Sequence, residues 1–169
     1  MNKDNKIKKI VLTAMLSAII CITTMIFHIP IGFNGAYIHL GDTFIFLAAV
    51  ILPKPYAMIA AILGAGLADF LSGGIVWIIP TIIIKPIMVA FLTSKNKDLL
   101  CRRNIFLVFI AGFIGSIGYY LAGAIMVGSF ITPLPSFFLD LIQPISSGII
   151  FLGIGYALDK INIREKIYS

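Results

Sequence analysis

The chain has 169 residues, of which 60% are hydrophobic and 12% are charged, and its mean hydropathy is +1.06. Soluble domains are roughly 45–50% apolar and roughly 25% charged, so this composition excludes an ordinary soluble domain and indicates an all-α integral membrane protein. Because a spanning helix needs about 20 apolar residues, about six such segments use up the chain. We therefore expect a single six-helix membrane domain over residues 1–169, with no room for a nucleotide-binding fold.

The net charge of +6 does not indicate nucleic-acid binding, because the charges fall at the ends of apolar segments. With six spans, 12 of the 13 Lys and Arg residues lie on one side of the bilayer, and Lys85 is the exception. The positive-inside rule then places both termini in the cytoplasm. The expected location is the cell membrane, crossed several times.

The apolar segments, in chain order, cover about residues 7–27, 40–52, 56–71, 75–93, 105–127 and 137–158. A stretch rich in Pro, Gly and Asn, residues 28–39, separates the first two and is expected to be an ordered outer loop. Ser72, Gly73 and Gly74 predict a tight turn between the third and fourth segments. A polar tail begins at Asp159.

Two charges, Asp69 and Lys85, flank that turn inside apolar sequence. A charge at the centre of a membrane helix costs roughly 2.5–3.5 kcal/mol, which predicts either a structural ion pair or a shared polar site. Trp77, Thr81 and Lys85 recur every four residues and so share one helix face. We expect this face to contact a ligand, and Asp69 to shape the turn. Asp42 fits either ligand contact or a structural acid in the first turn of the second helix.

Further polar side chains lean toward the outer side, among them Asp140, Gln143 and Ser147, which share one face of the last segment. Tyr119 and Tyr120 lie deeper, near the middle of the fifth segment, and fit ordinary packing as well. This asymmetry predicts a pocket that is open to the exterior and captures a small polar solute. His28 and His39 flank the outer loop, but no further ligand has the spacing of a metal site. No nucleophile–base arrangement emerges either, so we expect neither an enzyme nor a metal or other cofactor.

Small residues mark one face of two helices. Ala14 and Ala18 are four residues apart on the first, and the fifth carries Gly112, Gly115 and Gly118. Such faces let membrane helices approach closely. Each face serves either internal packing or contact with a partner subunit.

These features resemble the substrate-binding S component of energy-coupling factor (ECF) vitamin transporters. Ala14-x-x-x-Ala18 is similar to the motif by which S components dock on their coupling subunit. The run from Gly66 through Asp69 and Gly73, then Trp77-x-x-Pro80-Thr81 and Lys85, resembles the hydroxymethylpyrimidine and pyridoxine subgroup. The resemblance covers nearly the whole chain.

The resemblance implies a six-helix subunit that captures a vitamin or precursor from outside and works with a membrane-embedded coupling subunit and two cytoplasmic ATPases. It implies pocket positions from the outer loop and the outer parts of the later helices, namely Asn34, Tyr37, His39, Trp77, Thr81, Lys85, Tyr119, Asp140 and Gln143. Vitamin B6 or hydroxymethylpyrimidine is the expected substrate. Pantothenate, thiamine and riboflavin remain alternatives, as does a standalone carrier that needs no ATPase.

Overall fold

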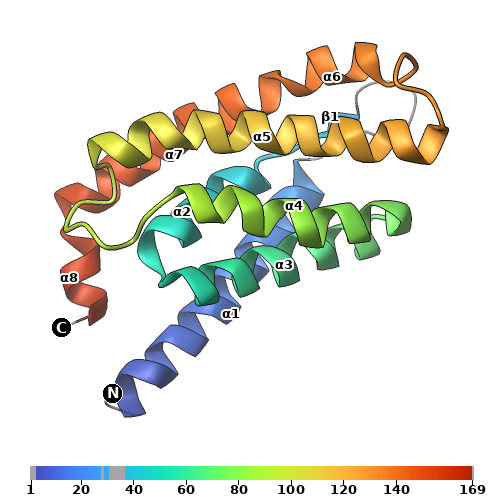
Figure 1. Cartoon of the computed structure of the whole chain (residues 1–169). Helices are drawn as coiled ribbons and strands as arrows, with labels where there is room; N and C mark the ends of the chain where they lie inside the picture. The colour runs from blue at the N-terminus through green and yellow to red at the C-terminus, as the bar shows by residue number, and fades with distance from the viewer. Residues whose placement is uncertain (1–2, 28, 31–36, 169) are drawn as a thin grey trace.

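The computed structural model in Figure 1 describes residues 3–27, 29–30 and 37–168. Apart from one pair of two-residue strands, its regular structure is helical. The elements in chain order are α1 (Lys3–Ile26), β1 (Ile29–Pro30), β2 (Tyr37–Ile38), α2 (Gly41–Ile51), α3 (Lys54–Leu71), the 3₁₀ helix η1 (Ile75–Trp77), α4 (Ile78–Phe91), α5 (Arg102–Val127), α6 (Leu134–Asp140), α7 (Ile142–Lys160) and α8 (Ile163–Tyr168).

The helices match the apolar segments expected from the sequence. Within the described residues, four segments are long and apolar enough to cross a membrane: Asn5–Ile26, Lys54–Leu71, Arg102–Val127 and Leu134–Lys160. Gly41–Ile51 and Ile75–Phe91 are apolar but shorter. That all six cross a bilayer stays a prediction. Figure 1 places both chain ends at the same end of the bundle.

Helix α2 occupies the centre of the molecule. Its 11 residues rise about 17 Å, roughly half of the hydrocarbon core of a bilayer. Every residue of α2 except Phe44 is buried, and the helix packs against α1, α3, α4, α5 and α7. A helix that is apolar on almost all sides lies either in a protein core or in lipid, and the burial of α2 by five helices places it in the core.

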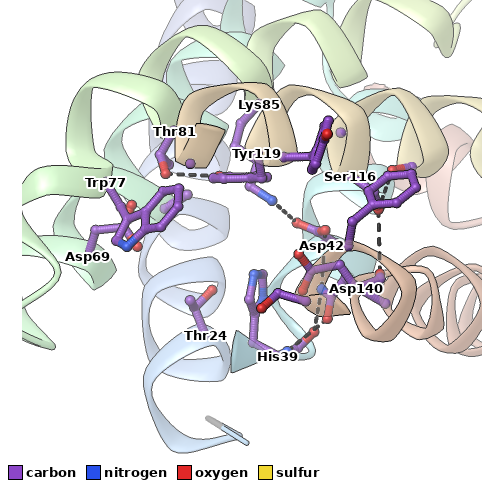
Figure 2. Close-up of a pocket in the computed structure, with 18 of the residues that line it drawn as sticks. Thr24, His39, Asp42, Asp69, Trp77, Thr81, Lys85, Ser116, Tyr119 and Asp140 are labelled. Carbon is purple, nitrogen blue, oxygen red and sulfur yellow. Dashed lines mark hydrogen bonds and ion pairs between the residues drawn. The ribbon is translucent and has the colours of Figure 1, made fainter. Parts of the chain in front are cut away.

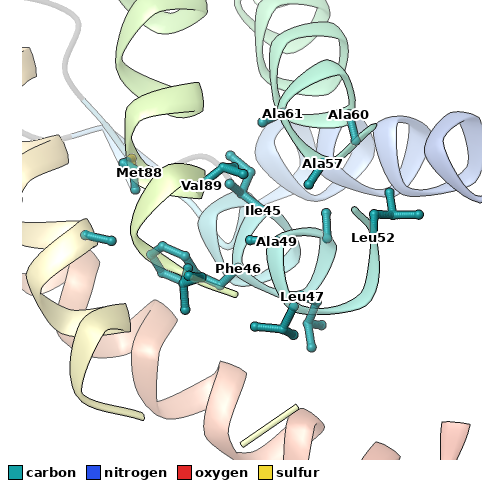
Figure 3. Packing of buried hydrophobic residues seen from close by; sticks show 14 of the residues in the cluster. Ile45, Phe46, Leu47, Ala49, Leu52, Ala57, Ala60, Ala61, Met88 and Val89 are labelled. Carbon is teal, nitrogen blue, oxygen red and sulfur yellow. The ribbon is translucent and has the colours of Figure 1, made fainter. Parts of the chain in front are cut away.

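Close packing around α2 depends on small side chains. Ala57, Ala60 and Ala61 of α3 are fully buried beside it, and Met88 and Val89 of α4 complete this cluster (Figure 3). Alanines let the helix axes approach closely, which increases van der Waals contact between helices in lipid.

The small face of α5 packs inside the bundle. A side chain at Gly112 would come within 2.4 Å of the Cβ of Pro144, and one at Gly115 within 2.7 Å of the sulfur of Met88. For α5, the structure thus favours internal packing. Ala14 and Ala18 of α1 are instead exposed, beside large exposed apolar residues such as Met15 and Ile22.

The last apolar segment is interrupted, which the sequence reading missed. We expected one helix over residues 137–158, but α6 ends at Asp140 and α7 begins at Ile142. Pro144 explains the break, because it has no N–H to donate to the carbonyl of Asp140 four residues earlier. The hydroxyl of Ser116 on α5 donates to that carbonyl instead, at 3.4 Å.

A buried polar network, here called the loop network, stabilises the connection between α4 and α5. The fully buried amide of Asn104 donates to the carbonyls of Thr93 and Leu99, both at 2.9 Å, and accepts from the Thr93 N–H at 3.0 Å. The carboxylate of Asp159 accepts from the N–H groups of Leu99 and Leu100, at 2.8 and 2.9 Å. These two side chains therefore satisfy backbone groups that no helix can pair.

The polar tail is partly helical. It forms α8, whose Tyr168 hydroxyl donates to the carbonyl of Ile51 at 3.0 Å. Lys97 and Glu165 form an exposed ion pair at 3.0 Å beside this contact. The tail thus packs against the last residue of α2.

Candidate functional site

A cavity opens among α1, α2, α3, α4, α5, α6 and α7 (Figure 2). Its volume is about 90 Å³, against the roughly 10–15 Å³ that one water molecule needs, so it has room for a small organic molecule. Its lining combines charged, polar and aromatic side chains: Thr24, His39, Asp42, Ala65, Asp69, Trp77, Thr81, Lys85, Gly112, Gly115, Ser116, Tyr119, Tyr120, Gly123, Pro133, Ser136, Phe137, Asp140 and Gln143.

A buried ion pair lies in the middle of this cavity. The ammonium of Lys85 on α4 lies 2.5 Å from Oδ1 of Asp42 in the first turn of α2, and their side chains are only 3% and 5% exposed. The ammonium also lies 4.9 Å from the centre of the Tyr119 ring, a cation–π distance. The expected alternative of an Asp69–Lys85 ion pair is therefore wrong, because Asp42 is the partner of Lys85.

Asp42 fits both positions that the sequence had presented as alternatives. It is the first-turn acid of α2, where the helix dipole favours a negative charge, and it also lines the cavity. Its contact with a ligand stays a prediction. Nothing in its sequence context points to Lys85, which lies 43 residues away.

Gln143 of α7 forms hydrogen bonds to the backbone of His39, just before the start of α2. Its Nε2 donates to the carbonyl of His39 at 2.7 Å and to Oδ2 of Asp42 at 3.2 Å, and its Oε1 accepts from the His39 N–H at 2.8 Å. Both N–H bonds of the Gln143 amide are thus engaged. Gln143 positions Asp42, and together with Lys85 these residues form what we call the cavity network.

Aromatic side chains supply an apolar surface beside the ion pair. Trp77 at the start of α4 lies 6.0 Å from Tyr119 of α5 between ring centres, with the rings tilted by 54°. The hydroxyls of Thr81 and Tyr119 are 2.8 Å apart and hydrogen-bonded, which fixes the Tyr119 ring. This surface can stack against a flat ring, while the charged groups bind its polar edge.

Asp69 and Asp140 bring two more carboxyl groups to the cavity. The backbone carbonyl of Asp69 accepts from the Gly74 N–H at 2.7 Å and closes the expected turn, in which Gly73 has a positive φ of 80°. Its carboxyl group lines the cavity as well. Asp140 ends α6, where the helix breaks.

Seven of the nine nominated pocket residues line this one cavity: His39, Trp77, Thr81, Lys85, Tyr119, Asp140 and Gln143. Asn34 lies outside the described residues, and Tyr37 is described only as backbone in β2. Ser147, expected on the face of Asp140 and Gln143, is buried elsewhere, and its carbonyl accepts from the Thr43 hydroxyl at 3.1 Å.

The sequence reading missed several lining residues. Thr24 comes from α1, Tyr120 comes from α5, and Ser136 and Phe137 come from α6. Ordinary packing was one alternative for Tyr120, and its hydroxyl donates to the carbonyl of Phe130 at 2.7 Å, which holds the loop before α6. Pro133, Pro135 and Pro144 are the sequence features that could have indicated an irregular segment around α6.

The arrangement is that of a binding site within an apolar helix bundle. Among the described residues, no group of three His, Cys, Asp or Glu side chains is placed to hold a metal ion. Ionisable groups within an apolar helix bundle mark a functional site by default, and here they surround a space that a small solute can fill.

Comparison with known proteins identifies the family. The profile of the family "ECF-type riboflavin transporter, S component" matches residues 4–160. The chain therefore belongs to the family of S components of ECF-type transporters. These are membrane proteins and substrate-binding transporter subunits, not enzymes.

Two further comparisons bear on the fold. A crystal structure of the S component for biotin from an ECF-type ABC transporter superposes with a TM-score of 0.65 and 22% identity, over 95% of each chain. At this identity the likeness shows the S-component fold alone. An uncharacterized protein from Pyrococcus woesei is 29% identical over 142 residues, which cover 83% of this chain and 95% of that protein.

Proposed function

We propose that this S component captures a small, water-soluble, heteroaromatic vitamin or precursor from outside the cell, with vitamin B6 or hydroxymethylpyrimidine as its substrate. The observation that carries the proposal is the cavity in which the Lys85–Asp42 pair lies beside the Trp77–Tyr119 surface. A flat ring fits between aromatic and charged groups of this kind.

The size of the cavity favours a ligand with a single ring. Drug-sized ligands occupy pockets of roughly 300–1,000 Å³, so a volume of about 90 Å³ argues against a three-ring system with a sugar-alcohol chain. Riboflavin is the second candidate, because the matching family profile carries the name of riboflavin transporters.

The same proposal sets the orientation in the membrane. Both termini and the loop between α4 and α5 face the cytoplasm, since they carry most of the Lys and Arg residues. The cavity then opens toward the exterior of the cell membrane, where the substrate is encountered.

Transport requires partners in this proposal: a membrane-embedded coupling subunit and two cytoplasmic ATPases. The exposed alanines of α1, Ala14 and Ala18, form the docking face for the coupling subunit. Small side chains there let a partner helix approach closely, which supports this assignment.

The substrate is tested by calorimetry of the detergent-solubilised protein against B vitamins and their precursors. We expect saturable binding of a B6 vitamer or hydroxymethylpyrimidine and weaker binding of riboflavin. Tight binding of riboflavin alone contradicts the B6 assignment and supports the second candidate.

The partners are tested by transport into liposomes with and without coupling and ATPase subunits. Uptake by the chain alone contradicts the proposed mechanism and favours a standalone carrier. Ala18→Trp is expected to abolish uptake by the complete complex and to leave ligand affinity unchanged. Ile149→Trp, at an exposed apolar position of α7, is the matched control and retains uptake.

A further inference from the structure

The cavity holds more acidic groups than basic ones. Asp42, Asp69 and Asp140 line it, but Lys85 is the only lysine or arginine among its described lining residues. The sequence itself limits the supply of cations. Between Lys9 and Lys95 it contains only Lys54 and Lys85, and residues 104–159 contain no Lys or Arg. Lys54 is engaged elsewhere, donating to the carbonyl of Ala90 at 2.7 Å.

The charge of Lys85 is already matched inside the protein. Its ammonium lies 2.5 Å from the Asp42 carboxylate, which Gln143 holds in place. An anionic ligand would bind Lys85 only by approaching Asp42 as well, and like charges in a poorly solvated site repel strongly. A neutral acceptor faces no such repulsion, since an ammonium has three N–H donors.

The ring of His39 is engaged inside the protein. Its Nδ1 accepts a hydrogen bond from the Gly41 N–H at 3.0 Å, which favours the neutral imidazole, because an imidazolium has no acceptor nitrogen. The described lining therefore contains three carboxyl groups against one ammonium.

Asp140 is the acidic group most open to a ligand. Its side chain is half-buried at the break between α6 and α7, and no described residue donates a hydrogen bond to its carboxyl group. Figure 2 shows Asp69 beside Trp77 on one side of the cavity and Asp140 near Ser116 on the other, with the Lys85–Asp42 pair between them. A ring stacked near Trp77 and Tyr119 can thus direct a polar edge toward Asp140.

We propose that the cavity selects a nitrogen heterocycle without negative charge, whose amino group or protonated ring nitrogen donates to the Asp140 carboxyl group. This rests on the proposed function of the cavity as the vitamin site. The inference separates vitamins by charge: aminopyrimidines and pyridine alcohols or amines are accepted, and carboxylated or phosphorylated vitamins are rejected. Pantothenate, one of the alternative substrates that the sequence had left open, carries a carboxylate and is among the rejected ones.

The experiment uses pairs of ligands that differ in one charged group. Calorimetry of the full chain in detergent compares pyridoxine with 4-pyridoxate, nicotinamide with nicotinate, and hydroxymethylpyrimidine with its 5-carboxylate. In each pair of ligands that binds, we expect the uncharged ligand to bind at least about tenfold more tightly than the acid. Equal or tighter binding of the acids overturns the inference, and so does the absence of binding by every member of the panel.

The role of Asp140 is tested by Asp140→Asn, which removes the charge and keeps the shape. Affinity for the aminopyrimidine should fall about ten- to hundredfold, and discrimination against the acid should shrink. Asp98→Asn makes the same change at an exposed position in the loop between α4 and α5, and should change neither. Unchanged affinity and discrimination in Asp140→Asn, in protein that unfolds at the parental temperature, overturns the assignment of Asp140.

The outcomes distinguish this inference from the broader proposal. If the acids bind and the complex still transports them in an ATP-dependent way, the charge selection is wrong and the S-component function stands. If uncharged ligands bind as expected but the chain transports them without ATPases, the charge selection stands and the proposed coupling is wrong.

Discussion

The cavity network and the loop network are both buried and polar, but they differ in their bonding partners and in whether they line the binding cavity. Within the described part of the chain, the side chains of Asn104 and Asp159 in the loop network bond only to backbone groups, and neither residue lines the candidate binding cavity. In the cavity network, Lys85, Asp42 and Gln143 bond to one another and to His39, beside an open space. A polar network that only stabilises backbone should affect folding, whereas one beside a cavity should affect binding as well.

Lys85→Met is expected to have the largest effect, because it leaves the Asp42 carboxylate buried without its cation. Removing one partner of a buried pair costs about 3–5 kcal/mol, so the free energy of unfolding should fall by that amount and ligand binding should be lost. Unfolding in detergent and calorimetry measure the two effects.

The double variant Asp42→Leu/Lys85→Met separates these two effects. Two apolar side chains replace the pair, so most of the lost stability should return while binding stays absent. Normal ligand affinity in this double variant would show that the pair is structural, and it would remove the contrast with the loop network.

Asn104→Leu should have the next largest effect, and on stability only. Three hydrogen bonds to the backbone of the loop are lost, which should lower the free energy of unfolding by about 2–4 kcal/mol. Ligand affinity should stay within about twofold of the parent, because the loop network shares no partner with the cavity network. Asn96→Leu makes the same substitution at an exposed position and should leave both quantities unchanged.

Ser116→Ala should have the smallest effect. Its hydroxyl makes two long contacts of 3.4 Å, to the carbonyls of Gly112 and Asp140, so the expected loss of stability is below about 1 kcal/mol. If thermal unfolding shows a loss of several kcal/mol in stability, the Ser116 hydroxyl fixes the geometry of the chain between α6 and α7. The shape of the cavity would then depend on this hydroxyl.

The sequence predicted those parts of the site that depend on spacing along one helix. Trp77, Thr81 and Lys85 share a face of α4 because of helical periodicity, and the structure brings all three to the cavity. The apolar runs and the turn residues between them also located the helices to within a few residues at most of their ends.

The sequence did not predict contacts between helices. Lys85 meets Asp42 because α2 lies in the centre of the bundle, and that position follows from the packing of five neighbouring helices. At the break near Leu141, the carbonyl of Asp140 accepts from Ser116 of α5, a contact that the local sequence does not indicate. Such partners lie far apart in the chain, so no local pattern indicates them.

Both ends of α2 are held by polar contacts, so this short helix forms a rigid connection between the cavity and the C-terminal tail. Its first turn carries Asp42, which holds Lys85 and Gln143, and its last residue, Ile51, is bonded to Tyr168 of α8. From Asp42 to Ile51 the helix spans about 14 Å, and every side chain in between except that of Phe44 is buried, so the helix cannot slide without disturbing its neighbours. A force applied at the tail, for example by a subunit that grips α8, would therefore be delivered directly to the charges in the cavity.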